Sequence, residues 1–119
     1  MPVRVYNQKV RMTFNEYQEQ ALSTAIYPDQ YRIFYPSLGL VGESGEVAEK
    51  VKKVLRDKGR LFDELTKSEI VKEISDVLWY LAALASDLGV SLDHVAEVNI
   101  SKLLSRKERN VLQGSGDNR

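Results

Sequence analysis

Two long segments with the periodicity of an amphipathic helix, separated by only a few residues, constrain the fold of this 119-residue chain most. Apolar residues recur at helical spacing over residues 38–58 and again over residues 66–88, which indicates two helices that each bury one face. Gly59 and Gly89 follow the two segments, and glycine is common just past a helix C-terminus. Because the connection 59–65 is short, we expect the helices to form an antiparallel hairpin.

A shorter helix is predicted before this hairpin, over residues 14–25. Thr13 and Glu16 form a capping box at its start, and Pro28 ends it. Residues 27–37 hold two prolines and four aromatic side chains, which indicates an irregular but packed connection.

Cap residues also mark the starts of two other helices. Thr66 and Glu69 form a second capping box, and Ser91 is a cap candidate for a last helix that runs to about residue 108. No segment shows a strong strand pattern. The sequence therefore predicts an all-α fold, a four-helix bundle-like arrangement around the central hairpin.

Composition limits the class of protein. Seventeen basic and 17 acidic residues balance, so no net field favours nucleic acid or an anionic membrane as a partner. The chain has no cysteine, and its one histidine, His94, excludes a multi-histidine zinc site within one chain. No apolar run approaches membrane-spanning length, so we expect a soluble, cytoplasmic protein. One domain is predicted over 1–109, followed by a polar, glycine-rich tail over 110–119 that is mobile unless a ligand or a neighbouring subunit orders it.

Four carboxylates stand in two matched pairs within the hairpin. Glu43 and Glu46 lie in the first helix, and Glu73 and Asp76 in the second. Each pair has i, i+3 spacing, so both side chains share one helix face. We measure angles at 100° per residue from one apolar residue of each helix, Leu40 in the first and Ile70 in the second. The first member of each pair then lies about 60°, and the second about 120°, to the same side. In an antiparallel hairpin the two pairs therefore converge.

Converging carboxylates repel one another unless protons or hard cations neutralise them. Mg²⁺ or Mn²⁺ with oxygen ligands is the natural counter-ion. Acidic residues beside an apolar stripe are also normal on the exposed side of an amphipathic helix. One such pair is explained by ordinary surface charge, whereas two pairs with equal offset and hand suggest a site.

Basic and amide side chains form a second candidate group. Asn99, Lys102 and Arg106 share one ridge of the last helix, and Lys53 lies on the acid-bearing side of its helix. Cations near a metal–carboxylate centre suit a polyphosphate ligand. The alternative is a solvated basic face near a helix C-terminus, where the macrodipole favours Lys and Arg.

Two aromatic residues follow the second acidic pair. Tyr80 projects to the acid side of its helix, and we include it among the candidate substrate-binding residues. Trp79 points away from the apolar stripe of its own helix. We interpret Trp79 as an anchor at an oligomer interface, with a base-stacking platform as the alternative.

Three strings carry a resemblance to a known family: Gly39-Leu-Val-Gly-Glu43-Ser-Gly-Glu46, Lys72-Glu73-Ile-Ser-Asp76 and Asn99-x-x-Lys102-Leu-x-x-Arg106. In this order they closely resemble the MazG-like nucleotide pyrophosphohydrolases of the all-α NTP pyrophosphatase superfamily. The signature of that family is ExxE, a spacer and ExxD. The resemblance implies the four-helix MazG fold, working as a homodimer or homotetramer.

The resemblance also implies an enzyme that uses Mg²⁺, or Mn²⁺, to hydrolyse a (d)NTP to the (d)NMP and diphosphate. By motif position Glu43, Glu46, Glu73 and Asp76 would be the metal ligands. Either Glu43 or Glu46 would also be catalytic, orienting or deprotonating the attacking water. The residues that would hold phosphates or close the site are Lys53, Asn99, Lys102 and Arg106.

The resemblance leaves other functions open. One is a phosphoribosyl-ATP pyrophosphohydrolase of histidine synthesis, and another is a dUTP/dCTP-specific relative. A helical dimerisation module without activity is the non-enzyme alternative. The full set of four acids argues against that module, because a binding module has no need of a self-repelling cluster.

Overall fold

The computed structural model describes residues 11–119, so the first ten residues of the predicted domain lie outside the described part. Within that part the chain forms four α-helices, one 3₁₀ turn and no strand: α1 Phe14–Leu22, η1 Asp29–Tyr31, α2 Phe34–Asp57, α3 Glu64–Asp87 and α4 Leu92–Glu108. The predicted all-helical class is confirmed.

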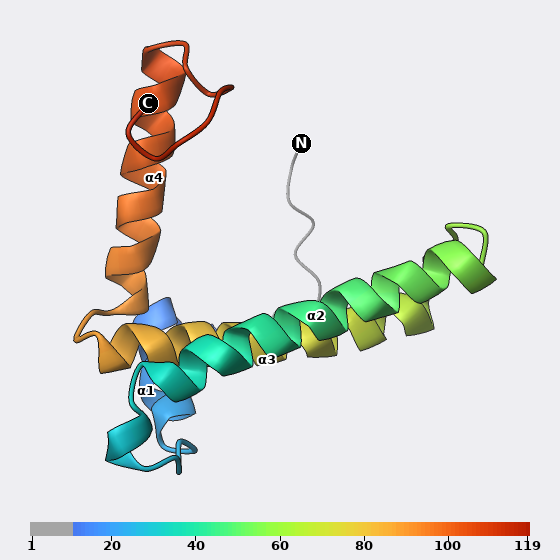
Figure 1. Ribbon diagram of the computed structural model, residues 1–119, viewed down its shortest axis with the longest axis horizontal. Coiled ribbons are helices and arrows are strands. Elements are labelled where there is room, and N and C mark those ends of the chain that lie inside the picture. The colour runs from blue at the N-terminus through green and yellow to red at the C-terminus, as the bar shows by residue number, and fades with distance from the viewer. Residues whose placement is uncertain (1–10) are drawn as a thin grey trace.

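Helices α2 and α3 lie side by side, and the connection 58–63 joins them at one end (Figure 1). Helix α1 packs against α3 near the other end, and α4 rises from there and stands away from the α2–α3 pair (Figure 1). Among residues 11–119, no helix combines the length and apolar character needed to cross a bilayer.

Two of the predicted helix starts agree with the structure. The hydroxyl of Thr13 accepts from the backbone N–H of Glu16 at 3.1 Å at the start of α1. The hydroxyl of Ser91 accepts from the backbone N–H of His94 at 3.1 Å at the start of α4. These caps satisfy backbone donors that have no partner within the helix.

The start of α3 was predicted wrongly at Thr66. The carboxylate of Asp63 accepts from the backbone N–H of Thr66 at 2.8 Å, so Asp63 is the N-cap. An aspartate is at least as good a cap as a threonine, and it comes earlier in the chain. The Thr66 hydroxyl is buried and accepts from Nζ of Lys58 instead.

Helix α2 also begins earlier than residue 38. It starts at Phe34 and includes Pro36 in its first turn, where the missing N–H of proline costs nothing. The segment 27–37, predicted to be irregular, is therefore shorter at its C-terminal side. Before this segment, α1 ends at Leu22 rather than at the predicted residue 25.

One amide side chain joins three parts of the fold. Nε2 of Gln18 donates to the carbonyl oxygens of Ala82 and Val90, both at 3.2 Å. Its Oε1 accepts from the backbone N–H of Leu92 at 3.0 Å. Both ends of the amide are thus satisfied, and α1, the end of α3 and the start of α4 are held together.

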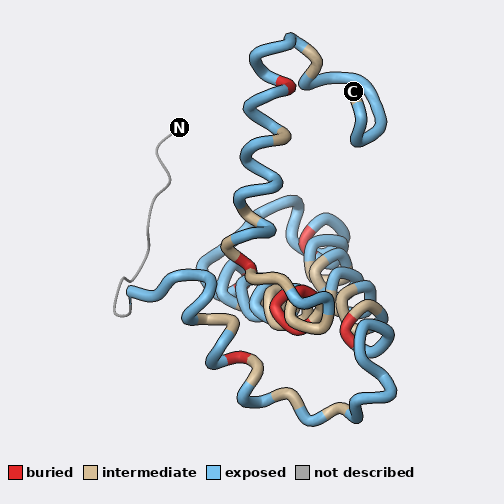
Figure 2. The backbone as a smooth tube through the Cα atoms, turned by 90° about the vertical axis from the view of Figure 1, so that its left-hand side faces the viewer, coloured by how far each residue is buried: buried red, intermediate tan, exposed pale blue. Residues whose placement is uncertain are grey.

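The core of a single chain is small (Figure 2). Its buried cluster consists of Ala21, Ala82, Ala85 and Leu92. Large apolar residues elsewhere face outward, among them Leu38 at 75 % and Val41 at 72 % exposure. The radius of gyration is 17.0 Å, whereas a compact chain of this length has about 13.5 Å. One chain therefore leaves extensive apolar surface without cover.

The C-terminal tail, 110–119, is held by its own chain. The guanidinium group of Arg119 donates to the carbonyl oxygens of Val111 and Leu112, each at 3.2 Å. The side chain of Asp117 pairs with cations of α4. We expected a ligand or a neighbouring subunit to be needed to order this glycine-rich segment, but these contacts place it against α4.

Helix α2 lies close to the Tyr80 side chain of α3 at Gly39, where a methyl group would overlap the ring. Gly42, in the same helix, has open space around its Cα. We expect Gly39→Ala to lower the free energy of unfolding by about 1–3 kcal/mol, because the ring must move. Gly42→Ala is the matched control and should raise it by about 0.5–1 kcal/mol. Urea unfolding at one protein concentration measures both, and a stabilised Gly39→Ala variant would contradict the close approach.

Candidate metal centre

Three of the four predicted metal ligands meet in the structure. One carboxylate oxygen from each of Glu43, Glu73 and Asp76 lies within 4.8 Å of the others. Glu43 comes from α2 and the other two from α3. Glu46 is exposed and is not part of this group.

Two contacts along the hairpin explain why these acids meet. Gly39 of α2 faces Tyr80 of α3, and Lys50 of α2 makes a 4.0 Å ion pair with Glu69 of α3. Going forward along α2 thus means going backward along α3. Between these contacts the same register sets Glu43 opposite Asp76.

Burial and neighbouring carboxylates raise the pKa of Glu43. Desolvation raises it above 4.5, and the negative charges of Asp76, Glu73 and Glu46 raise it further. Among the described residues, no Lys or Arg forms an ion pair with any of these four acids. Within residues 11–119, therefore, no ion pair relieves the repulsion. A cluster of oxygen ligands with uncompensated charge fits Mg²⁺ or Mn²⁺.

A hollow of about 330 Å³ opens beside the carboxylates. Glu43 and Asp76 form its acidic side, and the side chains of Thr24, Trp79 and Tyr80 complete its lining. It therefore combines negative charge with two aromatic side chains. Sequence patterns gave no sign of Thr24, because it reaches the hollow from the segment after α1.

Trp79, which is partly buried, makes hydrogen bonds and packing contacts within its own chain. Its indole Nε1 donates to the hydroxyl of Thr24 at 2.9 Å and is 3.2 Å from the carbonyl oxygen of Ala21. The ring also packs against the buried cluster of alanines and Leu92. Our interpretation of Trp79 as an interface anchor did not foresee these contacts, because their partners Ala21 and Thr24 are far from Trp79 in the sequence.

Tyr80 lies between the carboxylates and other aromatic rings. Its ring meets Trp79 edge-on, with 5.0 Å between ring centroids. Desolvation raises the pKa of Tyr80 above 10, and Tyr35 and the carboxylates of Glu43 and Asp76 add to the increase. The phenol is therefore protonated at neutral pH and can donate a hydrogen bond.

The predicted phosphate-binding residues lie apart from the carboxylates. Lys53 pairs with Glu49 at 3.8 Å, and both are partly exposed. Asn99, Lys102 and Arg106 are on α4, which stands away from α2 and α3 (Figure 1). The structure does not bring them to the carboxylates of the same chain.

Lys102 and Arg106 contact a carboxylate of the tail instead. Asp117 Oδ1 lies 3.2 Å from Nζ of Lys102 and 3.3 Å from a guanidinium nitrogen of Arg106. Arg106 is only 5 % exposed, and its buried Nε has no hydrogen-bond partner among the described residues. The two cations lower the pKa of Asp117.

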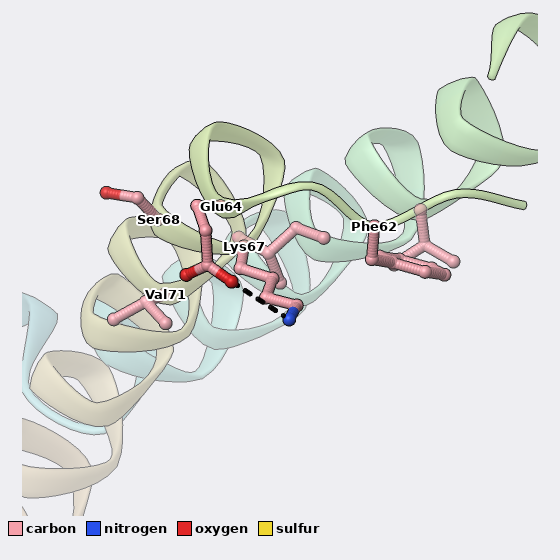
Figure 3. Close-up of a pocket in the computed structure, with 7 residues that line it drawn as sticks. Phe62, Glu64, Lys67, Ser68 and Val71 are labelled. Carbon is pink, nitrogen blue, oxygen red and sulfur yellow. Dashed lines mark hydrogen bonds and ion pairs between the residues drawn. The ribbon is translucent and has the colours of Figure 1, made fainter. Parts of the chain in front are cut away.

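A second, larger hollow of about 760 Å³ lies beside the start of α3 (Figure 3). Apolar side chains, including Phe62 and Val71, form most of its lining. Its acid and base, Glu64 and Lys67, pair with each other at 3.2 Å (Figure 3). No group of carboxylates converges here, so we take the smaller hollow as the candidate site.

Fold and site together define an all-α protein with a candidate divalent-metal centre beside an aromatic hollow. Residues 37–111 match the family model for the MazG nucleotide pyrophosphohydrolase domain, and the chain belongs to this family. It is 49 % identical over 109 residues to the Gene 37 protein of Mycobacterium phage L5, a match that covers 87 % of this chain and 96 % of that protein. No solved structure gives a significant match.

Charge repulsion at the centre has a measurable consequence. The pKa of Glu43 is higher in the folded than in the unfolded chain, so protonation of Glu43 favours folding as pH falls toward 4.5, and its charge opposes folding at neutral pH. We expect metal-free Glu43→Gln to melt at a higher temperature than the parent at pH 7. This difference should shrink as pH approaches 4.5.

Mg²⁺ or Mn²⁺ should stabilise the parent protein at pH 7 and stabilise Glu43→Gln less, because the variant has lost a ligand. Thermal unfolding with and without the ion measures both effects. Glu97→Gln, on the exposed part of α4, serves as the control and should behave like the parent. Equal stabilisation of the parent and Glu43→Gln would contradict the assignment of Glu43 as a ligand.

Proposed function

We propose that this protein is a Mg²⁺-dependent nucleoside triphosphate pyrophosphohydrolase that converts a (d)NTP and water to the (d)NMP and diphosphate. The observation that carries this proposal is the meeting of Glu43, Glu73 and Asp76 inside the segment that matches the family. The aromatic hollow beside them supports a nucleoside as the rest of the substrate.

In this proposal Glu43, Glu73 and Asp76 hold Mg²⁺, with Mn²⁺ as a substitute. When bound, the ion neutralises phosphate charge and lowers the pKa of a bound water. Glu46 is the fourth ligand of the proposal. The register that sets Glu43 opposite Asp76 also sets Glu46 opposite Glu73. A different rotamer of the exposed Glu46 side chain would therefore bring its carboxylate to the other three.

The carboxylates also have a catalytic role in the proposal. Glu43 or Glu46 orients the attacking water or takes its proton, and the exposed position of Glu46 leaves it free to do so. Tyr80, with its raised pKa, keeps its phenolic proton and can donate it in a hydrogen bond to the substrate. Its ring and that of Trp79 give the nucleoside apolar surface.

Diphosphate release from the canonical NTPs and dNTPs, dUTP and phosphoribosyl-ATP tests the proposal, with Mg²⁺, Mn²⁺ or EDTA. We expect EDTA to abolish release. Asp76→Asn and Glu73→Gln should lower kcat/KM at least on the order of 100-fold, since each removes a ligand charge. Glu97→Gln is the control. Preference for phosphoribosyl-ATP, or for dUTP and dCTP, would identify one of the narrower functions, and no release from any substrate would favour the dimerisation module.

The proposal includes a homodimer or homotetramer, because one chain exposes much apolar surface. It also assigns phosphate binding to Lys53, Asn99, Lys102 and Arg106. Since α4 stands away from the α2–α3 pair (Figure 1), on which the carboxylates lie, its cations would serve the site of a second copy. A phosphate would then replace the tail carboxylate of Asp117 as the partner of Lys102 and Arg106.

Mixed oligomers test this assignment. We expect Asp76→Asn and Lys102→Ala each to be nearly inactive alone. After the two variants are unfolded and refolded together, random pairing should restore about a quarter of parental activity, because half of the dimers have one intact site of two. Each variant refolded alone is the control. No recovery in a mixture shown to contain mixed dimers would place Lys102 with the carboxylates of its own chain.

A further inference from the structure

The last residue of α3, Asp87, is a buried carboxylate outside the candidate metal centre. Its side chain is 6 % exposed and forms a 3.4 Å ion pair with Arg32. It also accepts from the hydroxyl of Tyr27 at 2.9 Å and from the backbone N–H of Ile33 at 2.8 Å. Burying a carboxylate is unfavourable unless its oxygens are satisfied. These three contacts satisfy it and tie the segment 27–33 to the end of α3.

One of these contacts holds a strained residue. Ile33 has φ of 70°, a conformation that is costly for a β-branched side chain. Ile33 is also the N-cap of α2 and makes no capping hydrogen bond with its own side chain. The carboxylate of Asp87 therefore supplies an acceptor and a negative charge where the helix macrodipole favours one.

Another contact leads to the candidate site through stacked rings. Tyr27, which donates to Asp87, stacks on Tyr35 with 4.8 Å between centroids and 19° between ring planes. Tyr35 packs against Tyr80 at 6.3 Å, and Tyr80 meets Trp79 at 5.0 Å. A continuous row of rings thus runs from Asp87 to the hollow beside the carboxylates.

We propose that Asp87 is a positioning residue for the nucleoside half of the substrate: it fixes Tyr27 and Ile33, and thereby sets the row of rings that ends at Tyr80. This inference rests on the proposed function, because it assigns the aromatic hollow to the nucleoside. Asp87 is not one of the acids that meet at the metal centre. Its loss therefore acts on nucleotide binding rather than on hydrolysis of the bound nucleotide.

Steady-state kinetics of Asp87→Asn test the inference with the triphosphate that the parent hydrolyses fastest. Tyr27 and Ile33 both donate to Oδ2 of Asp87, whereas Oδ1 lies beside Arg32. An asparagine therefore either turns its amide nitrogen toward Arg32 and loses the ion pair, or turns it toward Tyr27 and Ile33 and leaves both donors unpaired. We expect KM to rise about tenfold while kcat stays within about twofold. Asp93→Asn, in the first turn of α4, is the matched control and should change neither constant. An unchanged KM, or a kcat that falls as far as KM rises, overturns the inference.

Tyr27→Phe is the milder variant, because it keeps the ring and removes one hydrogen bond to Asp87. We expect KM to rise about threefold with kcat unchanged. Should Asp87→Asn fail to fold, this variant decides the question, and an unchanged KM overturns the inference there too.

Fluorescence separates failure of this inference from failure of the proposed function. Trp79 is the only tryptophan of the chain, and it contacts Tyr80 at the end of the row. Without any nucleotide, we expect acrylamide to quench Trp79 about twofold more strongly in Asp87→Asn than in the parent, as the row loosens. Unchanged quenching overturns the role of Asp87 whether or not the protein hydrolyses nucleotides. Increased quenching in a protein that hydrolyses no nucleotide supports the role of Asp87 in positioning the rings. It contradicts only the assignment of the hollow to a nucleoside.

Discussion

The close approach of the Tyr80 ring to Gly39 is the contact on which the rest of the site depends. A residue without a side chain lets the ring lie against the backbone of α2. Glu43 follows Gly39 by one helical turn, and Asp76 precedes Tyr80 by one turn. The contact between Gly39 and Tyr80 therefore sets both the spacing of the two helices and the position of these two carboxylates opposite each other.

The small core explains why so much of the structure is held by polar contacts. Few apolar side chains are buried in one chain (Figure 2), so hydrophobic burial alone holds α1 and α4 weakly. The amide of Gln18 supplies three directed contacts at the junction of α1, α3 and α4. Asp87 does the same where α2 begins. Both side chains fix the direction of a helix at its end, while the exposed apolar faces stay available to a second copy.

Sequence periodicity predicted the helices well because each helix buries one face of a regular repeat. It predicted the helix ends less well, because neighbouring residues compete to cap a helix. Asp63 displaced Thr66 in this way, and the start of α2 at Phe34 depends on a distant carboxylate that no local pattern reveals. Local cap patterns were sufficient where the cap and its partner lie within one turn, as at Thr13 and Ser91.

The candidate site shows the same division. Spacing along two helices predicted that four carboxylates share a side, because a helix turns by a fixed angle per residue. Three of them, Glu43, Glu73 and Asp76, meet in the structure, and Glu46 is not part of that group. Spacing could not place α4, whose direction depends on a turn and on the Gln18 contacts rather than on a repeat. Lys102 and Arg106 therefore lie on one face of α4, as predicted. In this chain, however, both pair with the tail carboxylate of Asp117.

Repulsion at the metal centre and strain at the start of α2 have opposite consequences for the two halves of the site. Within residues 11–119 the carboxylates have no cationic partner, and desolvation together with their mutual repulsion raises the pKa of Glu43. The aromatic side is complete before any ligand arrives, because Asp87 offsets the cost of the Ile33 conformation. A preset apolar wall loses little entropy on binding, whereas an unneutralised acidic cluster binds a polyphosphate poorly until the ion is present. If the proposed function holds, the two halves would impose an order of binding, in which the metal ion arrives before or together with the phosphates and tight binding of the nucleotide follows.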